Sequence, residues 1–146
     1  KWKNIPSRIW TDAAGEAIDK EFTGTYDIVG SDIDPRAVEI ARSNAEKAGV
    51  EDVVRFEVAD AADFHGEGKY GQVVTNPPYG ERLMEKADAE ELYRVFGAAC
   101  GKLPPDWRVL VLSSHTEFER SFGKKADKKR KLYNGMIKCD LFMYGK

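Results

Sequence analysis

The sequence has 146 residues, of which 42% are hydrophobic and 33% are charged, with a formal net charge of −2. This length and apolar content suit a single domain, and the charge balance excludes a chain that is basic throughout. No apolar run reaches the roughly 18 residues of a membrane-spanning helix, so no membrane partner is expected. Cys100 and Cys139 lack metal-ligand spacing, which predicts no metal site and a reducing, cytoplasmic location.

The first third of the chain predicts one strand between two helices. Apolar residues at helical spacing predict a helix within residues 5–22, and a short apolar run predicts a buried parallel strand at 26–31. Asp34 and Pro35 then occupy the N-cap and first-turn positions of another helix. Gly49 is expected to end that helix in the left-handed conformation that glycine adopts easily.

The rest of the chain continues this alternation and then departs from it. Strands are predicted at 53–58, 72–75 and 108–112, the last fully buried, and helices at 87–103 and 116–122. Two final strands, 129–133 and 136–144, flank Asn134-Gly135, a strong hairpin signal. Alternating strands and helices that end in a hairpin predict an α/β fold, with a mostly parallel sheet and one antiparallel edge.

The tetrapeptide Asn76-Pro77-Pro78-Tyr79 directly follows the strand predicted at 72–75. The side-chain oxygen of Asn76 and the carbonyl of Pro77 can accept both hydrogens of one planar –NH2 group, and Tyr79 offers a flat face for a base. The nitrogen lone pair would then face an electrophile, as an enzyme that methylates amines with S-adenosylmethionine requires. A proline-rich turn with a packed tyrosine is the alternative.

Acidic residues end the two strands that precede this tetrapeptide. Asp32 can accept hydrogen bonds from two vicinal ribose hydroxyls, and it is a better candidate than Asp34, which is needed as a helix cap. Ile33 can lie against an adenine ring. Asp60 can accept from the adenine amino group, while a backbone N–H beside it, at Ala61, donates to a ring nitrogen. Each aspartate also suits an ordinary turn at the end of a strand.

Three ordered motifs together resemble the class I S-adenosylmethionine-dependent amino-methyltransferases. They are Ser-Asp-Ile-Asp-Pro at 31–35, Val-Ala-Asp-Ala-Ala-Asp-Phe at 58–64 and Asn-Pro-Pro-Tyr-Gly-Glu-Arg-Leu at 76–83. With the basic tail Lys-Lys-Arg-Lys-Leu-Tyr-Asn-Gly at 128–135, the chain is similar to the THUMP-associated RNA methylases. Within these it resembles the large-subunit ribosomal RNA guanine-N2 methyltransferase family over essentially residues 1–146.

This resemblance implies a Rossmann-like class I methyltransferase sheet and assigns roles to the candidate residues. Asp32 would bind the ribose of S-adenosylmethionine and Asp60 its adenine, with Asn76 also beside the cofactor. Asn76, Pro77 and Tyr79 would form the catalytic site for the amine and its base. The substrate would be RNA, most simply ribosomal RNA methylated at N2 of guanine.

One departure from the family concerns the methionine end of the cofactor. The family's fold starts with a strand and a glycine-rich loop, and no such pattern precedes Asp32. The missing strand would lie between the strands that end near Asp32 and Asn76. We therefore expect residues 1–146 to form a single, partial catalytic domain with a gap in its sheet. Its partner would be an upstream segment of the same protein, carrying the glycine-rich loop and an RNA-binding domain.

Other features leave alternatives open. Six of the eight residues from 124 to 131 are basic, which suits contact with RNA phosphates or a solvated edge strand. Residues 113–115, Ser-Ser-His, lack an evident third partner for nucleophilic catalysis and are expected to form a loop near the target base. An adenine-N6 methyltransferase acting on RNA or DNA, a glutamine-N5 protein methylase and an inactive RNA-binding fragment remain the rival functions.

Overall fold

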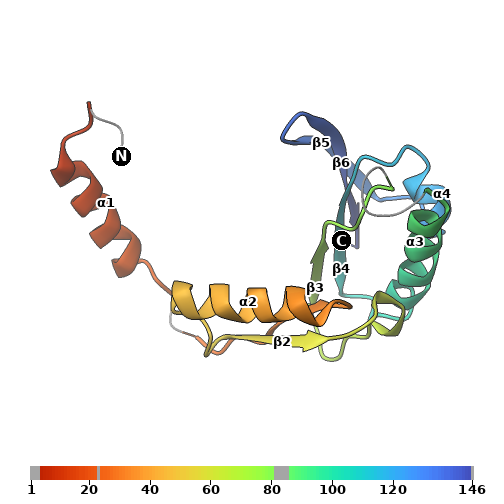
Figure 1. Ribbon diagram of the computed structural model, residues 1–146, viewed down its shortest axis with the longest axis horizontal. Helices are drawn as coiled ribbons and strands as arrows, with labels where there is room; N and C mark the ends of the chain where they lie inside the picture. The colour runs from red at the N-terminus through yellow and green to blue at the C-terminus, as the bar shows by residue number, and fades with distance from the viewer. Residues whose placement is uncertain (1–3, 23, 81–85, 146) are drawn as a thin grey trace.

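The computed structural model describes residues 4–22, 24–80 and 86–145 of the chain (Figure 1). Each helix and strand expected from the sequence is present, with small shifts at its ends. In chain order the elements are α1 (Ser7–Asp19), β1 (Ile28–Asp32), α2 (Pro35–Ala48), β2 (Val54–Val58), the short 3₁₀ helix η1 (Ala61–Asp63), β3 (Gln72–Thr75), α3 (Lys86–Cys100), β4 (Arg108–Ser113), α4 (Phe118–Phe122), β5 (Lys128–Asn134) and β6 (Ile137–Tyr144).

The strands form two sheets. β1 and β2 pair in parallel, while the second sheet has the order β3-β4-β6-β5, parallel between β3 and β4 and antiparallel in the other two pairs. The expected α/β class and the C-terminal antiparallel hairpin are confirmed. Within the described parts of the chain, no strand pairing joins β1 to β3, so the sheet is interrupted where the family resemblance implies a further strand.

The core lies between the four-stranded sheet and the two helices α3 and α4, which cover one of its faces (Figure 1). Its aromatic members come from both layers: Tyr93, Phe96, Phe118, Phe122, Phe142 and Tyr144. The rings of Phe118 and Phe142 have centroids 4.5 Å apart, and Phe64, which follows η1, meets Phe96 at 6.0 Å. The contact at Phe64 connects the β1–β2 half of the chain to this core.

Two strands that the sequence predicts to be buried are less covered than expected. In β4, Val109, Val111 and Ser113 are buried while the intervening leucines are half-buried, because α3 and α4 pack on a single face. In β1, Ile28 and Val29 are 46% and 44% exposed. The helix that packs on the β1–β2 pair is α2, and it lies along one face of that pair (Figure 1).

The C-terminal hairpin turns one residue later than its sequence signal suggested. Asn134 pairs with Ile137, so the two loop residues are Gly135 and Met136 rather than Asn134 and Gly135. Gly135 has a φ of 61°, a left-handed conformation that costs glycine no steric strain at the first position of a tight hairpin loop. The shift makes Asn134 the last paired residue of β5 and leaves its side chain available for other contacts.

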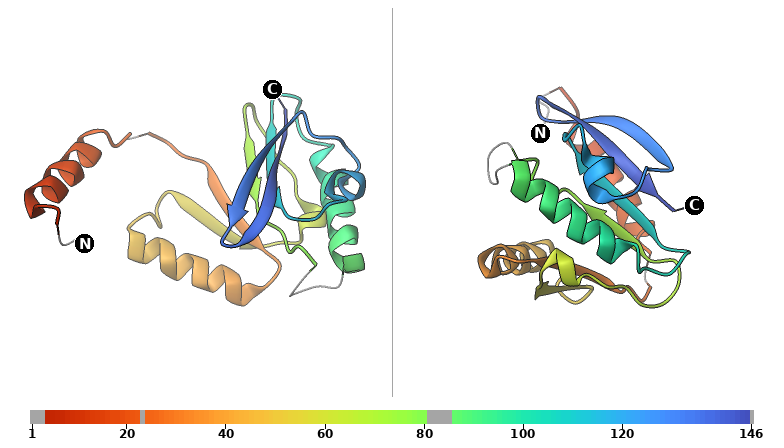
Figure 2. Two further views of the ribbon diagram at one scale, coloured as in Figure 1. Left: turned by 90° about the horizontal axis from the view of Figure 1, so that it is seen from above. Right: turned by 90° about the vertical axis from the view of Figure 1, so that its right-hand side faces the viewer.

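Helix α1 stands apart from the two sheets (Figure 2). Its apolar residues Ile9, Trp10 and Ile18 are exposed, and the helix has no buried residue. None of the described helices is both long enough and apolar enough to cross a membrane.

Gly97 is expected to be essential for the packing of α3 against α4. A Cβ atom at Gly97 would lie 2.1 Å from the carbonyl oxygen of Phe122, and a backbone atom cannot move aside cheaply. We expect Gly97→Ala to lower the free energy of unfolding by about 1–3 kcal/mol through overpacking, as measured by urea denaturation. Gly15→Ala is the control, because a Cβ there has open space. Equal stability of the two variants would contradict this packing.

Candidate active site

The carboxyl ends of β1 and β2 bring two candidate cofactor ligands together. The N–H of Ala59 donates to the carbonyl of Asp32 at 3.1 Å, which extends the parallel ladder and places Asp60 beside the end of β1. In each carboxylate, Oδ1 accepts a backbone N–H two residues later, from Asp34 at 2.9 Å and from Ala62 at 2.8 Å. These turns fix both side chains, and the second oxygen of each carboxylate has no such partner among the described residues.

Asp34 is occupied as the sequence predicts. Its side chain caps α2 by accepting from the Arg36 N–H at 2.9 Å and also pairs with the Arg36 guanidinium at 3.0 Å. These hydrogen bonds lower the pKa of Asp34. Asp32, whose second carboxylate oxygen is not bound in the turn, therefore remains the better candidate for a ribose contact. Its neighbour Ile33 is 67% exposed at the same edge, and Ala61 begins η1 beside Asp60.

The segment after β3 brings Asn76 and Tyr79 into direct contact. The Tyr79 hydroxyl donates to Oδ1 of Asn76 at 2.5 Å and accepts from Nδ2 of Asn134 at 3.3 Å. The Cys139 thiol lies 3.6 Å from the same hydroxyl. Burial is the main cause that raises the pKa of Tyr79, so the phenol remains protonated and able to donate.

Sequence reasoning missed Asn134 and Cys139 as members of this site. In the sequence, Asn134 belongs to the basic-tail motif at 128–135 and to the hairpin signal, neither of which predicts a contact with Tyr79, and no sequence signal points to Cys139. The hydrogen bond from Tyr79 occupies one lone pair of the Asn76 oxygen and leaves the second lone pair available as an acceptor. The ring of Tyr79 was expected only as a stacking surface, and the structure adds this role for its hydroxyl.

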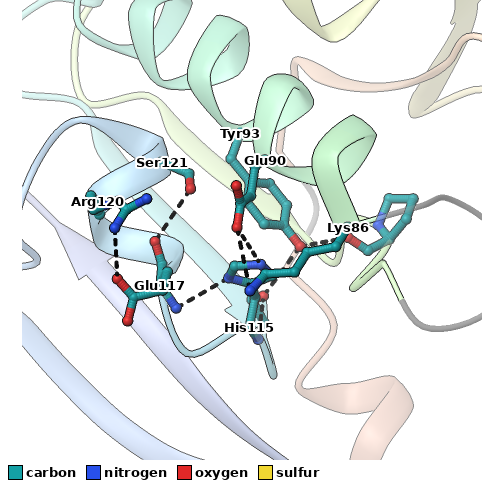
Figure 3. Close-up of polar contacts among 9 residues, drawn as sticks. Lys86, Glu90, Tyr93, His115, Glu117, Arg120 and Ser121 are labelled. Carbon is teal, nitrogen blue, oxygen red and sulfur yellow. Dashed lines mark hydrogen bonds and ion pairs between the residues drawn. The ribbon is translucent and has the colours of Figure 1, made fainter.

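A buried tyrosine holds the backbone of the same segment from behind (Figure 3). Tyr93 of α3 is 1% exposed, and its hydroxyl donates to the carbonyl of Pro78 at 2.5 Å. The hydroxyl of Ser113, at the end of β4, lies 3.5 Å from the same oxygen of Tyr93. Burial raises the pKa of Tyr93, which keeps its proton on the phenol. The loop is thus attached to both α3 and β4.

His115 extends this network towards α4 (Figure 3). Its backbone N–H donates to the Ser113 hydroxyl at 3.1 Å, and its Nδ1 accepts from the Glu117 N–H at 3.1 Å. Nε2 lies 3.3 Å from Oε1 of Glu90, within ion-pair distance, but the two atoms lack hydrogen-bond geometry. The imidazole therefore does not act on the Ser113 oxygen, and the contacts at 113–115 connect elements behind the loop.

The two groups of candidate residues lie on different sheets. In the described parts of the chain, no hydrogen bond or ion pair joins Asp32 or Asp60 to the segment at 76–80. The continuation of the longer motif, Glu81 to Leu83, lies outside the described residues. The same described parts contain no group of three or more histidine, cysteine or acidic side chains that could hold a metal ion.

Comparison with known families gives this arrangement a context. A family model described as the RMKL-like methyltransferase domain matches residues 2–142. The chain belongs to this methyltransferase family. Because the matched region contains both aspartate turns, the tetrapeptide at 76–79 and most of the hairpin, the family resemblance inferred from the motifs is confirmed.

Two curated relatives are similar over almost the whole chain. "Putative RNA methyltransferase YpsC" of Bacillus subtilis strain 168 is 42% identical over 144 residues, which cover 98% of this chain and 37% of YpsC. "Ribosomal RNA large subunit methyltransferase K/L" of Shewanella sp. strain W3-18-1 is 36% identical over 147 residues, covering 98% of this chain and 21% of that protein. The chain thus spans well under half of each relative.

Two solved structures share the fold and much of the sequence. SMU.472, described as "a putative methyltransferase complexed with SAH", has a TM-score of 0.88 and 41% identity, over 99% of this chain and 39% of its own. A protein described as "a predicted N6-adenine-specific DNA methylase" from Listeria monocytogenes strain 4b F2365 has a TM-score of 0.83 and 44% identity, over 99% and 37%. The chain has the class I methyltransferase fold.

The bond from Tyr93 to Pro78 is expected to stabilise the protein measurably. Tyr93→Phe leaves a carbonyl and a serine hydroxyl without their buried partner, which typically costs about 1–3 kcal/mol. Urea denaturation should show this loss, whereas Tyr133→Phe, at an exposed tyrosine on β5, should change stability by less than about 0.5 kcal/mol. Indistinguishable effects of the two substitutions would show that the Tyr93 hydroxyl bond contributes little.

Proposed function

We propose that this chain is part of an enzyme that transfers a methyl group from S-adenosylmethionine to N2 of a guanine in ribosomal RNA. The observation that supports the proposal is the site after β3, where exposed Asn76 precedes two prolines and its side-chain oxygen accepts a hydrogen bond from Tyr79. The family match and the SAH complex of SMU.472 support the donor. The printed names of YpsC and of the K/L methyltransferase support RNA, and ribosomal RNA in particular, as the substrate.

The amine would be held by acceptors on this chain. The second lone pair of Asn76 Oδ1 and the carbonyl of Pro77 take the two amine hydrogens, while the Tyr79 ring lies against the base. The target base leaves its stack to reach this site. The cofactor supplies an electrophilic methyl group on a sulfonium sulfur. Fixed acceptors would orient the amine lone pair for in-line attack on this methyl group. The S–CH3 bond would break as the N–CH3 bond forms, releasing S-adenosylhomocysteine, and the methylated amine would lose its proton to water, so no strong base is required.

The cofactor would be held at the edge of the β1–β2 sheet. The second oxygens of Asp32 and Asp60 are available there, since their first oxygens are bound in turns. Asp32 accepts from the ribose hydroxyls and Asp60 from the adenine amino group. Exposed Ile33 covers one face of the adenine, and the N–H of Ala61 donates to a ring nitrogen. Asp34, whose side chain caps α2, would not contact the cofactor.

RNA would be positioned by the hairpin. All residues of β5 are exposed, and they include Lys128, Arg130 and Lys131, while Lys129 is 2.8 Å from Glu119. Contacts of basic side chains with phosphates set the position of a nucleic acid without reading its sequence. Asn134 ends this basic strand and reaches Tyr79, so bound phosphates would lie close to the amine site.

A segment outside residues 1–146 would complete the cofactor site. The relatives are more than twice as long as this chain, and apolar side chains on β1, β2 and β3 are exposed, with Val74 72% and Val58 52% accessible. Unpaired strand edges and exposed apolar residues favour the addition of a strand between β1 and β3. A glycine-rich loop after that strand would hold the methionine end of the cofactor.

Methylation of adenine at N6 is the second candidate. It is favoured by the printed description of the Listeria structure. The acceptor arrangement at Asn76 and Pro77 suits either exocyclic amine. The identity of the methylated nucleoside distinguishes the two.

Product analysis tests the reaction. The complete enzyme, incubated with unmodified ribosomal RNA and methyl-labelled S-adenosylmethionine, should yield N2-methylguanosine on nucleoside chromatography. N6-methyladenosine would establish the second candidate, and the absence of labelled RNA would refute both.

Asn76→Ala tests the catalytic assignment. Removing a fixed acceptor of this kind should lower the turnover number by ~100-fold or more. The affinity for S-adenosylhomocysteine, measured by calorimetry, should be nearly unchanged, because Asn76 is expected to act on the amine. Turnover close to that of the unmodified enzyme would place the acceptor elsewhere.

Asp32→Ala tests the ribose contact. Loss of charge-assisted hydrogen bonds should weaken binding of both S-adenosylmethionine and S-adenosylhomocysteine by about 2–3 kcal/mol, or about 30–150-fold in Kd. The same substitution at exposed Asp52, in the turn before β2, is the control and should leave both affinities unchanged. If Asp32→Ala behaves like this control, the ribose is bound by another group.

A further inference from the structure

A chain of hydrogen bonds joins the hairpin to the amine acceptor. Asn134 Nδ2, at the end of β5, donates to the Tyr79 hydroxyl at 3.3 Å, and that hydroxyl donates to Oδ1 of Asn76 at 2.5 Å. Asn134 and Asn76 are 58 positions apart in the sequence (134 − 76). The chain therefore exists only because the hairpin folds back beside the loop that follows β3.

The direction of these bonds determines how the Asn76 carboxamide is turned. A phenol has one proton, and because Asn134 and the Cys139 thiol both donate to its oxygen, that proton is directed to Asn76. A hydroxyl proton is accepted by the carboxamide oxygen and not by its NH2 group. Without it, the Asn76 side chain can turn by 180° and exchange Oδ1 with Nδ2. An NH2 group facing the substrate amine would then offer donors where an acceptor is required.

We propose that Asn134 is a positioning residue for methyl transfer, which acts through the Tyr79 hydroxyl to keep Oδ1 of Asn76 turned towards the substrate amine. The proposal rests on the amine methylation proposed above. It gives the hairpin a second role: β5 carries the basic residues that suit RNA phosphates, and its last residue sets the acceptor. The position of bound RNA and the orientation of the Asn76 carboxamide would thus both depend on β5.

The hairpin does not need the carboxamide of Asn134 for its stability. Asn134 is exposed, and its pairing with Ile137 uses backbone groups. The left-handed position of the loop belongs to Gly135, so the turn needs no asparagine before it. Removing the carboxamide of Asn134 leaves the strand pairing intact and removes one donor to Tyr79. The variant should therefore fold and differ in the site alone.

Kinetics of single and double variants test this coupling in the complete enzyme. Asn134→Ala and Tyr79→Phe should each lower kcat by about tenfold, the effect of a hydrogen bond worth about 1.4 kcal/mol, with KM for RNA changed less than twofold. The double variant should be no slower than Tyr79→Phe alone, because Asn134 acts only through that hydroxyl. Losses that multiply in the double variant would overturn the proposal, as would an unchanged kcat for Asn134→Ala.

Asn134→Asp separates orientation from packing. A carboxylate has the same shape but cannot donate, and it would accept the phenol proton that Asn76 now receives. Its kcat should be at least as low as that of Asn134→Ala. The matched control is Lys138→Ala on the facing strand β6, which should leave kcat unchanged. A kcat near that of the unmodified enzyme for Asn134→Asp would overturn the proposal.

A measurement without substrate keeps the two proposals distinguishable. In asparagine-labelled enzyme, the side-chain amide signal of Asn76 is identified as the one lost in Asn76→Ala. It should shift in Tyr79→Phe and in Asn134→Ala, and stay in place in Lys138→Ala. An Asn76 side-chain amide signal with the same chemical shift in Asn134→Ala as in the unmodified enzyme would overturn the inference. Shifts as expected in an enzyme that methylates no RNA would support the hydrogen-bond chain and refute only the proposed reaction.

Discussion

The packing of aromatic side chains between α3, α4 and the four-stranded sheet is the interaction on which the candidate active site depends. Phe118 and Phe122 of α4 lie against Phe142 and Tyr144 of β6, and Tyr93 of α3 packs edge-on against Phe118. These contacts fix α3 and β6 relative to β4 and β3. The loop at 76–80 begins where β3 ends, so its position depends on the aromatic core behind it.

Polar contacts then fix the loop itself from two sides. From the core side, the buried hydroxyl of Tyr93 holds the Pro78 carbonyl; from the open side, Asn134 holds the hydroxyl of Tyr79. Because Tyr93 fixes the backbone at Pro78 and Asn134 fixes the Tyr79 hydroxyl, the Asn76 oxygen has a defined direction as an acceptor. Such fixed groups act without reorganising during the reaction, which is the property that favours catalysis by positioning.

The cofactor half of the site is built differently. Asp32 and Asp60 are held by local backbone turns and by the parallel pairing of β1 with β2, and they depend little on the aromatic core. Phe64 against Phe96 is the aromatic contact that joins this half to the rest. β1 and β3 both carry exposed apolar residues, and in the described parts of the chain no strand pairing joins them.

The sequence by itself determined the order of the elements, the cap at Asp34 and the family, because caps, turns and hydrophobic periodicity are local properties of a chain. It also predicted a gap in the sheet. Tertiary structure decided what depends on distant segments: the one-sided burial of β4, the hydrogen bond from Tyr93 to Pro78 and the contact between Asn134 and Tyr79. No local pattern encodes these, because the residues meet only when strands and helices far apart in the chain pack against one another.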